Sequence, residues 1–266
     1  MNLKLNFSRK YRRIYVWPLL TVAVLILIVG WSLWNKGKAE GHKDRPTEYT
    51  YKSYTAANGI IVHRLQTSPD NIVLTEVDSS VVALEMYGIN GGFFYEKSLL
   101  SIAVNDDIPA TGGGKNDSSG WSNVKYARGT LLWDKAAQRF TVQVVSSAHN
   151  LKPTDRKQYW AQGGISMSLQ NDAGWHEQAE GEHMPGIDVA HMRSAVVYDQ
   201  NNQVHLYVTQ NLCTAEQFRT AVKEFGGSTL VDGVFLDGDG SSQMNATEIQ
   251  LPGDDREVRQ ILRIIK

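Results

Sequence analysis

Two aspartates that stand two residues apart are the side chains best suited to chemistry in this sequence. Asp237 and Asp239 alternate with glycine in residues 237–242, directly after the apolar run 231–236. Carboxylates act as nucleophiles, as bases for water and as stabilisers of the cationic transition state of glycoside hydrolysis. They also bind hard divalent cations. Two carboxyl groups this close do not both ionise cheaply unless a positive charge lies nearby.

A positive charge is available in a second segment, His191-Met-Arg-Ser-Ala195, which opens another apolar run. The planar guanidinium of Arg193 suits a phosphate group, which it can hold through two parallel hydrogen bonds. The imidazole of His191 can protonate or hydrogen-bond a leaving phosphate near neutral pH. Alone, an arginine before a strand is usually a surface charge and Asp-Gly after a strand is usually a turn, so catalytic roles for Asp237, His191 and Arg193 depend on the pattern that these segments form with the others.

Glycine pairs beside polar side chains mark two further segments. Asn90-Gly-Gly follows an apolar segment, and Gln162-Gly-Gly follows Tyr159-Trp160. Glycine lets a ligand approach the backbone closely, and successive backbone N–H groups can form an anion-binding nest. The predicted substrate-binding residues of these segments and of the aspartate loop are Asn90, Gly91, Gly92, Gln162, Gly163, Gly164, Gly238, Gly240, Ser241 and Ser242.

Together the four segments resemble the recurring blocks of the phosphodiester glycosidase family: Asn-Gly-Gly-Phe/Tyr-Phe, Gly-Gly-Pro, His-Pro-Arg-Thr-Ala and Leu-Asp-Gly-Gly-Gly-Ser-Ser. They occur in the family's order between residues 90 and 242. The family includes the lysosomal enzyme that removes N-acetylglucosamine from a phosphodiester. The resemblance implies a hydrolase that cleaves the bond between an anomeric carbon and a phosphate oxygen. It also implies that Asp237, His191 and Arg193 are the catalytic residues, with Asp237 in the acidic position.

The sequence departs from the family pattern at four positions. Ile165 and Met192 stand where the family has proline, and Ser194 stands where it has threonine. Asp239 replaces the middle glycine and adds a carboxylate to the predicted site. Asp239 is therefore our candidate metal ligand, for calcium or magnesium, although no cofactor is required by the sequence.

Three other stretches lack residues that their chemistry needs. Residues 111–115 have neither the spaced glycine nor the Ser or Thr of a phosphate loop. His176-Glu177 begins like a zinc-protease helix, but Glu180 stands in place of the second histidine, and the flanking glycines predict a solvated loop. Residues 237–248 have the ligand spacing of a calcium loop, but Ser242 stands where the sharp turn needs glycine.

Short strands must position these segments. Alternating and β-branched residues between 49 and 82 predict strands, and Asn58-Gly59 predicts a hairpin turn between two of them. The same signals predict hairpins over 129–145 and 195–209 and strands over 231–236 and 258–265.

One soluble helix is predicted over residues 214–225. Thr214 and Gln217 have the spacing of a capping box, and Phe218, Ala221 and Val222 share one face. With so few helices, the fold class is α+β, a single mixed, strand-rich domain preceded by one transmembrane helix.

The N-terminal segment has the pattern of that membrane helix. Residues 14–34 carry no charge, and a helix of 21 residues spans roughly 30 Å, the thickness of a bilayer core. Five basic residues and no acidic residue precede it, so the positive-inside rule places the N-terminus in the cytoplasm. A cleaved signal peptide is the alternative, but its apolar region is usually shorter and ends in small residues.

The chain thus divides into a cytoplasmic basic tail (1–13), a transmembrane signal anchor (14–34), a linker (35–48) and an extracellular domain (49–266) resembling a phosphodiester glycosidase. A hydrophobic content of 42% supports a packed core, and a net charge of −1 argues against a nucleic-acid partner. The lone Cys213 excludes an intramolecular disulfide.

These observations predict a hydrolase anchored in the cell membrane that acts outside the cell on a sugar-1-phosphodiester, with a cell-envelope glycopolymer as the substrate class. Its partners are then this substrate and the membrane. Two alternatives remain open. One is a non-catalytic carbohydrate- or phosphate-binding surface module of the same fold, and the other is a calcium-stabilised envelope domain.

Overall fold

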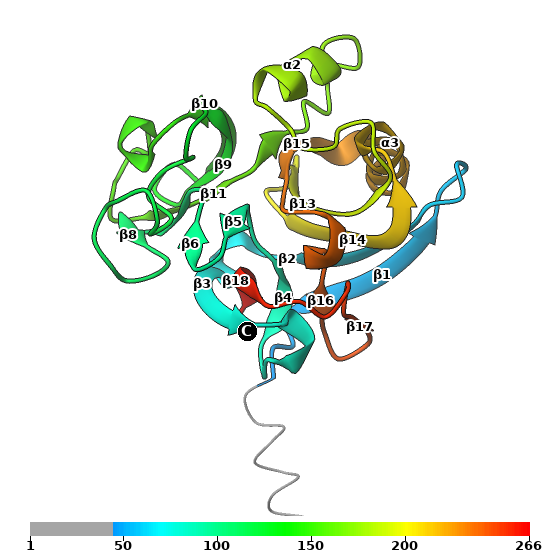
Figure 1. Cartoon of the computed structure of the whole chain (residues 1–266), viewed down its shortest axis with the longest axis horizontal. Coiled ribbons are helices and arrows are strands. Elements are labelled where there is room, and N and C mark those ends of the chain that lie inside the picture. The colour runs from blue at the N-terminus through cyan, green and yellow to red at the C-terminus, as the bar shows by residue number, and fades with distance from the viewer. Residues whose placement is uncertain (1–44) are drawn as a thin grey trace, which may run out of the picture. The chain divides into compact units, whose positions relative to one another are not determined.

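Antiparallel strands build most of the structure, a computed structural model that describes residues 45–266 (Figure 1). Every pairing between its named strands is antiparallel, in three larger sheets and one two-stranded ribbon. The predicted tail 1–13, the anchor 14–34 and most of the linker 35–48 lie outside the described residues. Within residues 45–266, no helix is long and apolar enough to cross a membrane.

The six-stranded sheet has both of its faces buried. Along its strands, Val196 and Val208 face one hydrophobic core, whereas Ala195, Val197 and Tyr207 face another. Because successive side chains of a strand alternate between the faces, a strand buried on both sides reads as an unbroken apolar run. In spatial order the strands are β1 (Tyr49–Thr55), β2 (Ile61–Thr67), β14 (Val204–Cys213), β13 (His191–Asp199), β15 (Leu230–Phe235) and β12 (Ile165–Ser166).

Two five-stranded sheets and the ribbon complete the strand content. One sheet has the order β10 (Arg139–Val145), β9 (Arg128–Asp134), β11 (Tyr159–Gly163), β7 (Ala103–Asn105) and β8 (Ile108–Pro109). The other has the order β17 (Gln250–Leu251), β16 (Met244–Asn245), β4 (Tyr87–Asn90), β18 (Val258–Ile264) and β3 (Ile72–Ser79). The ribbon pairs β5 (Phe94–Tyr95) with β6 (Ser98–Leu99). The largest core cluster takes side chains from all three sheets.

The helix predicted over 214–225 is confirmed as α3 (Ala215–Gly226). Thr214 caps it, and the capping box with Gln217 is complete. Its apolar face packs on the six-stranded sheet, with Phe218 and Val222 fully buried (Figure 1). The predicted hairpins are confirmed as β1–β2, β9–β10 and β13–β14.

A second helix, α2 (Trp175–Gly181), occupies the stretch for which the sequence predicts a solvated loop, so that prediction is wrong. Trp175 and Ala179 are buried in the core cluster that also contains Phe235. This tertiary contact outweighs the flanking glycines, which by themselves disfavour a helix.

The pairing of β13 with β15 determines where the functional segments meet. Ala195 lies opposite Phe235, and the strands are antiparallel, so the beginning of β13 and the end of β15 share one end of the sheet. The residues before Ala195 and after Phe235 are those predicted to do chemistry.

Candidate active site

Two segments hold the backbone of Asp237 just beyond the end of β15 through three hydrogen bonds. Its N–H donates to the Gly91 carbonyl (3.2 Å). Its carbonyl accepts hydrogen bonds from the Asn90 amide (2.8 Å) and the Ser194 hydroxyl (2.7 Å). The motif after β4 and the motif that opens β13 therefore fix the position of this one residue.

The carboxyl group of Asp237 is half-buried, and the surrounding protein raises its pKa to about 7. Removal from water is the main cause, because burial penalises the ionised form, and the negative charge of Asp239 acts in the same direction. Ser241, Arg256 and the backbone N–H of Gly238 act against the shift. A carboxyl group that ionises near pH 7 in a cavity has the properties expected of a catalytic acid or base.

The guanidinium of Arg193 is buried in the wall of the same cavity and holds a loop through hydrogen bonds. Nη2 donates to the carbonyls of Gly186 (2.6 Å) and Val189 (2.7 Å), and Nε donates to that of Cys213 (3.2 Å). Among residues 45–266, Nη1 makes no hydrogen bond. Burial lowers the pKa of Arg193, yet an arginine keeps its charge at physiological pH.

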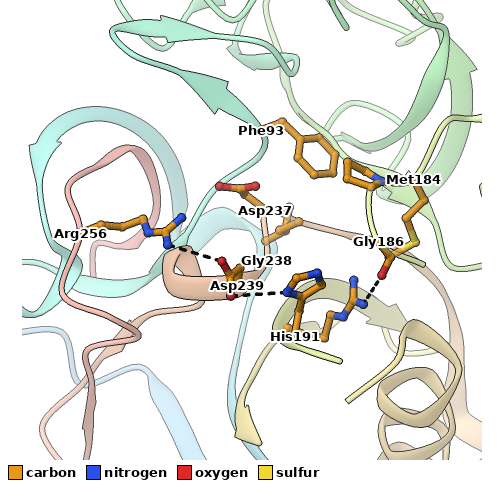
Figure 2. Close-up of a pocket in the computed structure, with 11 residues that line it drawn as sticks. Phe93, Met184, Gly186, His191, Asp237, Gly238, Asp239 and Arg256 are labelled. Atoms are coloured by element: carbon orange, nitrogen blue, oxygen red, sulfur yellow. Dashed lines mark hydrogen bonds and ion pairs between the residues drawn. The ribbon is translucent and has the colours of Figure 1, made fainter. Parts of the chain in front are cut away.

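Asp239 lies at the rim, between two positively charged or ionisable groups (Figure 2). One of its carboxylate oxygens is 3.5 Å from Nδ1 of His191, and the other is 3.5 Å from Nη2 of Arg256. Arg256 is also held by both carboxylate oxygens of Asp254, which raises the pKa of its guanidinium. The rim therefore contains paired charges of both signs.

These groups line a cavity of about 240 Å³. Its volume lies just below the usual range for small-molecule sites, and Figure 2 shows Asp237 between Arg256 and the apolar side chains of Phe93 and Met184. The lining residues are Phe93, Met184, Pro185, Gly186, His191, Arg193, Leu236, Asp237, Gly238, Asp239 and Arg256.

The cavity brings together the three predicted catalytic residues, Asp239 and Gly238. Asn90 and Gln162 are buried and lie outside its lining. The Asn90 amide bonds to the backbone at Asp237 and its carbonyl oxygen accepts from Gln243 N–H. Gln162 accepts a hydrogen bond from Gln260 (2.6 Å). Both side chains hold the segments together, and their predicted contact with substrate stays a prediction.

Most of the predicted ligand-binding glycines serve close packing of the backbone. A Cβ atom on Gly164 would lie 2.1 Å from the Phe235 carbonyl oxygen, and one on Gly163 would lie 2.7 Å from the Ile102 nitrogen. The N–H groups of Gly91 and Gly92 both donate to Gln260. They are therefore not free to form the predicted anion nest.

Ser241 and Ser242 are almost fully buried and lie outside the cavity lining. Neither hydroxyl has a hydrogen-bond partner of ordinary geometry among the described residues. The Ser241 hydroxyl is still close enough to Asp237 to lower the pKa of that carboxyl group. Buried hydroxyls without partners are costly, and this favours a role for both in binding water or ligand.

The sequence analysis missed Arg256, Phe93 and Met184 as lining residues. Arg256 lies in a run of mixed charges, residues 254–257, that has the composition of a solvated turn. Phe93 belongs to the motif that begins at Asn90, and that motif is the sequence signal that could have placed Phe93 in the cavity lining. In the part of the chain described here, no three His, Cys, Asp or Glu side chains gather as they would around a metal ion. The assignment of Asp239 as a metal ligand stays a prediction.

The fold and the cavity define a strand-rich domain whose pocket is lined by two carboxyl groups, Asp237 and Asp239, and two guanidinium groups, Arg193 and Arg256. Among known families, residues 85–265 match phosphodiester glycosidase. The chain belongs to the phosphodiester glycosidase family, so the resemblance that the four motifs indicate is confirmed.

Among solved structures, the catalytic domain of zebrafish N-acetylglucosamine-1-phosphodiester alpha-N-acetylglucosaminidase, auto-inhibited by its pro-peptide, has a similar fold. The TM-score is 0.60 at 14% identity, over 85% of this chain and 86% of that chain. A hypothetical protein from Synechocystis has a TM-score of 0.45 at 12% identity, over 81% of this chain and 60% of that chain. No curated protein matches the sequence.

Proposed function

We propose that this protein is a membrane-anchored hydrolase that cleaves the glycosidic bond of a sugar-1-phosphodiester outside the cell. The observation that carries the proposal is the half-buried Asp237, whose pKa is raised to about 7, in a cavity that also contains Arg193 and Arg256. Membership of the phosphodiester glycosidase family supports the same bond type.

Asp237 acts on the sugar side of the bond. Cleavage at the anomeric carbon passes through an oxocarbenium-like transition state, which a nearby carboxylate stabilises as a charge, as a nucleophile or as a base for water. The three backbone hydrogen bonds at Asp237 hold the carboxylate in place before substrate arrives. Such preorganisation removes a cost that a mobile group would incur during the reaction.

The other charged groups that line the cavity act on the phosphate side of the scissile bond. Nη1 of Arg193 and the guanidinium of Arg256 supply positive charge, and His191 is placed to donate a proton or a hydrogen bond to the leaving phosphate. Because a phosphate is already a good leaving group, the site depends less on a strong general acid than most glycosidases do.

The proposed location rests on the sequence alone. The five basic residues before the uncharged run 14–34 support an anchor with the domain outside the cell. An enzyme tethered at that surface meets envelope glycopolymers whose units are joined by phosphodiesters, and we propose these as the substrate class.

The test is release of a phosphomonoester from methyl esters of sugar 1-phosphates, with and without a chelator. The full chain is compared with Asp237→Asn and with Asp255→Asn, an exposed residue outside the cavity. Turnover by wild type and Asp255→Asn but not by Asp237→Asn supports the proposal. Binding without turnover in wild type indicates a carbohydrate- or phosphate-binding module, and unfolding on chelation indicates a calcium-stabilised domain.

A further inference from the structure

The backbone at Asp239 has a conformation that disfavours most side chains. Its φ is +54°, in the left-handed region where glycine is the least strained residue. The residue begins a short 3₁₀ turn, Asp239–Ser241, and its side chain is 54% exposed. Glycine would build this turn at lower cost, so the carboxylate calls for an explanation beyond the turn itself.

The carboxylate is not needed to pair the arginine beside it. Both oxygens of Asp254 already bind Arg256, with Oδ1 2.9 Å from Nε. The two contacts of Asp239, to Arg256 and to His191, are each 3.5 Å long, so neither is a tight ion pair. The charge of Asp239 is therefore held at the rim and acts on whatever occupies the cavity.

Two carboxyl groups, Asp237 and Asp239, line the cavity with the two guanidinium groups of Arg193 and Arg256. Asp254 lies outside the lining and already pairs with Arg256. The site has no surplus of positive charge beyond what His191 supplies when protonated. A ligand with one negative charge fits this balance better than a ligand with two. A phosphodiester has one negative charge, whereas a phosphomonoester approaches two at neutral pH, because its second ionisation lies near pH 6.

We propose that Asp239 is a specificity-determining residue that favours a monoanionic phosphodiester over the dianionic phosphomonoester that its cleavage releases. The inference rests on the proposed function and extends it to the release of the product. The carboxylate repels the second charge that appears on the phosphate when the glycosidic bond breaks. It thereby limits inhibition by the product in a cavity that would otherwise retain a dianion between two arginines.

The test measures binding of glycerol 1-phosphate and of its methyl ester to the full chain by titration calorimetry at pH 8 and pH 5. Asp239→Asn removes only the charge, because asparagine also tolerates the left-handed conformation. Asp255→Asn is the matched control, since Asp255 has a φ of +66° and lies outside the cavity.

At pH 8, Asp239→Asn should raise the affinity for the monoester relative to the diester by about three- to tenfold, the effect of one charge a few ångströms away when water screens the interaction. At pH 5, where both esters are monoanions, the ratio should not change, and Asp255→Asn should not change it at either pH. An unchanged ratio at pH 8, or the same change at both pH values, overturns the role of Asp239 alone. If wild type and both variants bind neither ester, this inference fails, whereas the proposed function stands or falls on the turnover of the methyl esters of sugar 1-phosphates.

Discussion

Replacing Asp237 by asparagine should abolish turnover and also stabilise the folded protein at alkaline pH. The carboxyl group ionises at about pH 7 in the folded protein, compared with its ordinary value of 3.8. Between these values the unfolded chain is ionised while the folded chain keeps its proton, so stability falls as pH rises. Above pH 7 both states are ionised, and the folded state carries the full cost of a carboxylate removed from water. Asparagine has no such cost.

The two pKa values set the size of the effect. Each unit of difference corresponds to about 1.4 kcal/mol, so the folded state loses at most about 4 kcal/mol above pH 7. Water reaches the half-buried carboxyl group, and screening reduces this to about 2 kcal/mol. Roughly half of that develops between pH 5 and pH 8, which for a domain of this size is about 2–4 °C in Tm.

The assay is thermal unfolding followed by circular dichroism at pH 5, 6, 7 and 8, for wild type, Asp237→Asn and Asp255→Asn. The Tm of Asp237→Asn should rise relative to the Tm of wild type as pH rises, whereas the Tm of Asp255→Asn should change with pH as that of wild type does. A difference in Tm that is constant from pH 5 to pH 8 would refute the raised pKa. Loss of turnover together with this gain in stability would identify Asp237 as a residue kept for chemistry at a cost in stability.

Four further outcomes are expected. The kcat/KM of wild type should rise with pH to a plateau with a midpoint near 7, since the ionised Asp237 is the active form; a fall above pH 7 would make it a proton donor. Arg193→Ala should lower the free energy of unfolding by about 3–5 kcal/mol, because three charge-assisted hydrogen bonds are lost, and it should also weaken phosphate binding. Arg193→Lys should restore neither property fully, as urea unfolding and calorimetry would measure. Gly164→Ala should destabilise the domain by about 2–4 kcal/mol in urea unfolding because of its 2.1 Å clash, whereas Gly181→Ala, with open space around it, should not. Protease added to intact cells should remove the domain after residue 40, and its protection would exclude the proposed topology.

The features that the sequence predicts correctly are local in origin. The capping box of Thr214 and Gln217 and the turn at Asn58-Gly59 act over a few residues, so both elements are found where expected. The charge and glycine pattern around Asp237 also identifies the central carboxylate, because that motif is contiguous.

The features that it misses depend on distant contacts. The helix α2 forms because Trp175 and Ala179 are buried by other parts of the chain, which no window around residues 175–181 reveals. Arg256 enters the cavity only because its loop packs against Gly240, where a Cβ atom would collide with the Asp254 carboxylate. The role of Gln162 also depends on a distant contact, because its side chain binds Gln260, which is almost a hundred positions away in sequence.

The position of β18 between β4 and β3 has a consequence for how the domain acquires its structure. The strand lies between β4 and β3. Ile264 of β18 pairs with Ile72 of β3, although the two residues are far apart in the sequence. Until residues 258–264 have left the ribosome, both neighbours present unpaired edges that other chains can join. Contacts of such long sequence separation also form slowly. The nascent chain must therefore remain incomplete and open to aggregation for almost the whole of its synthesis, and a chaperone that shields β3 and β4 should raise the yield more than one that shields α3.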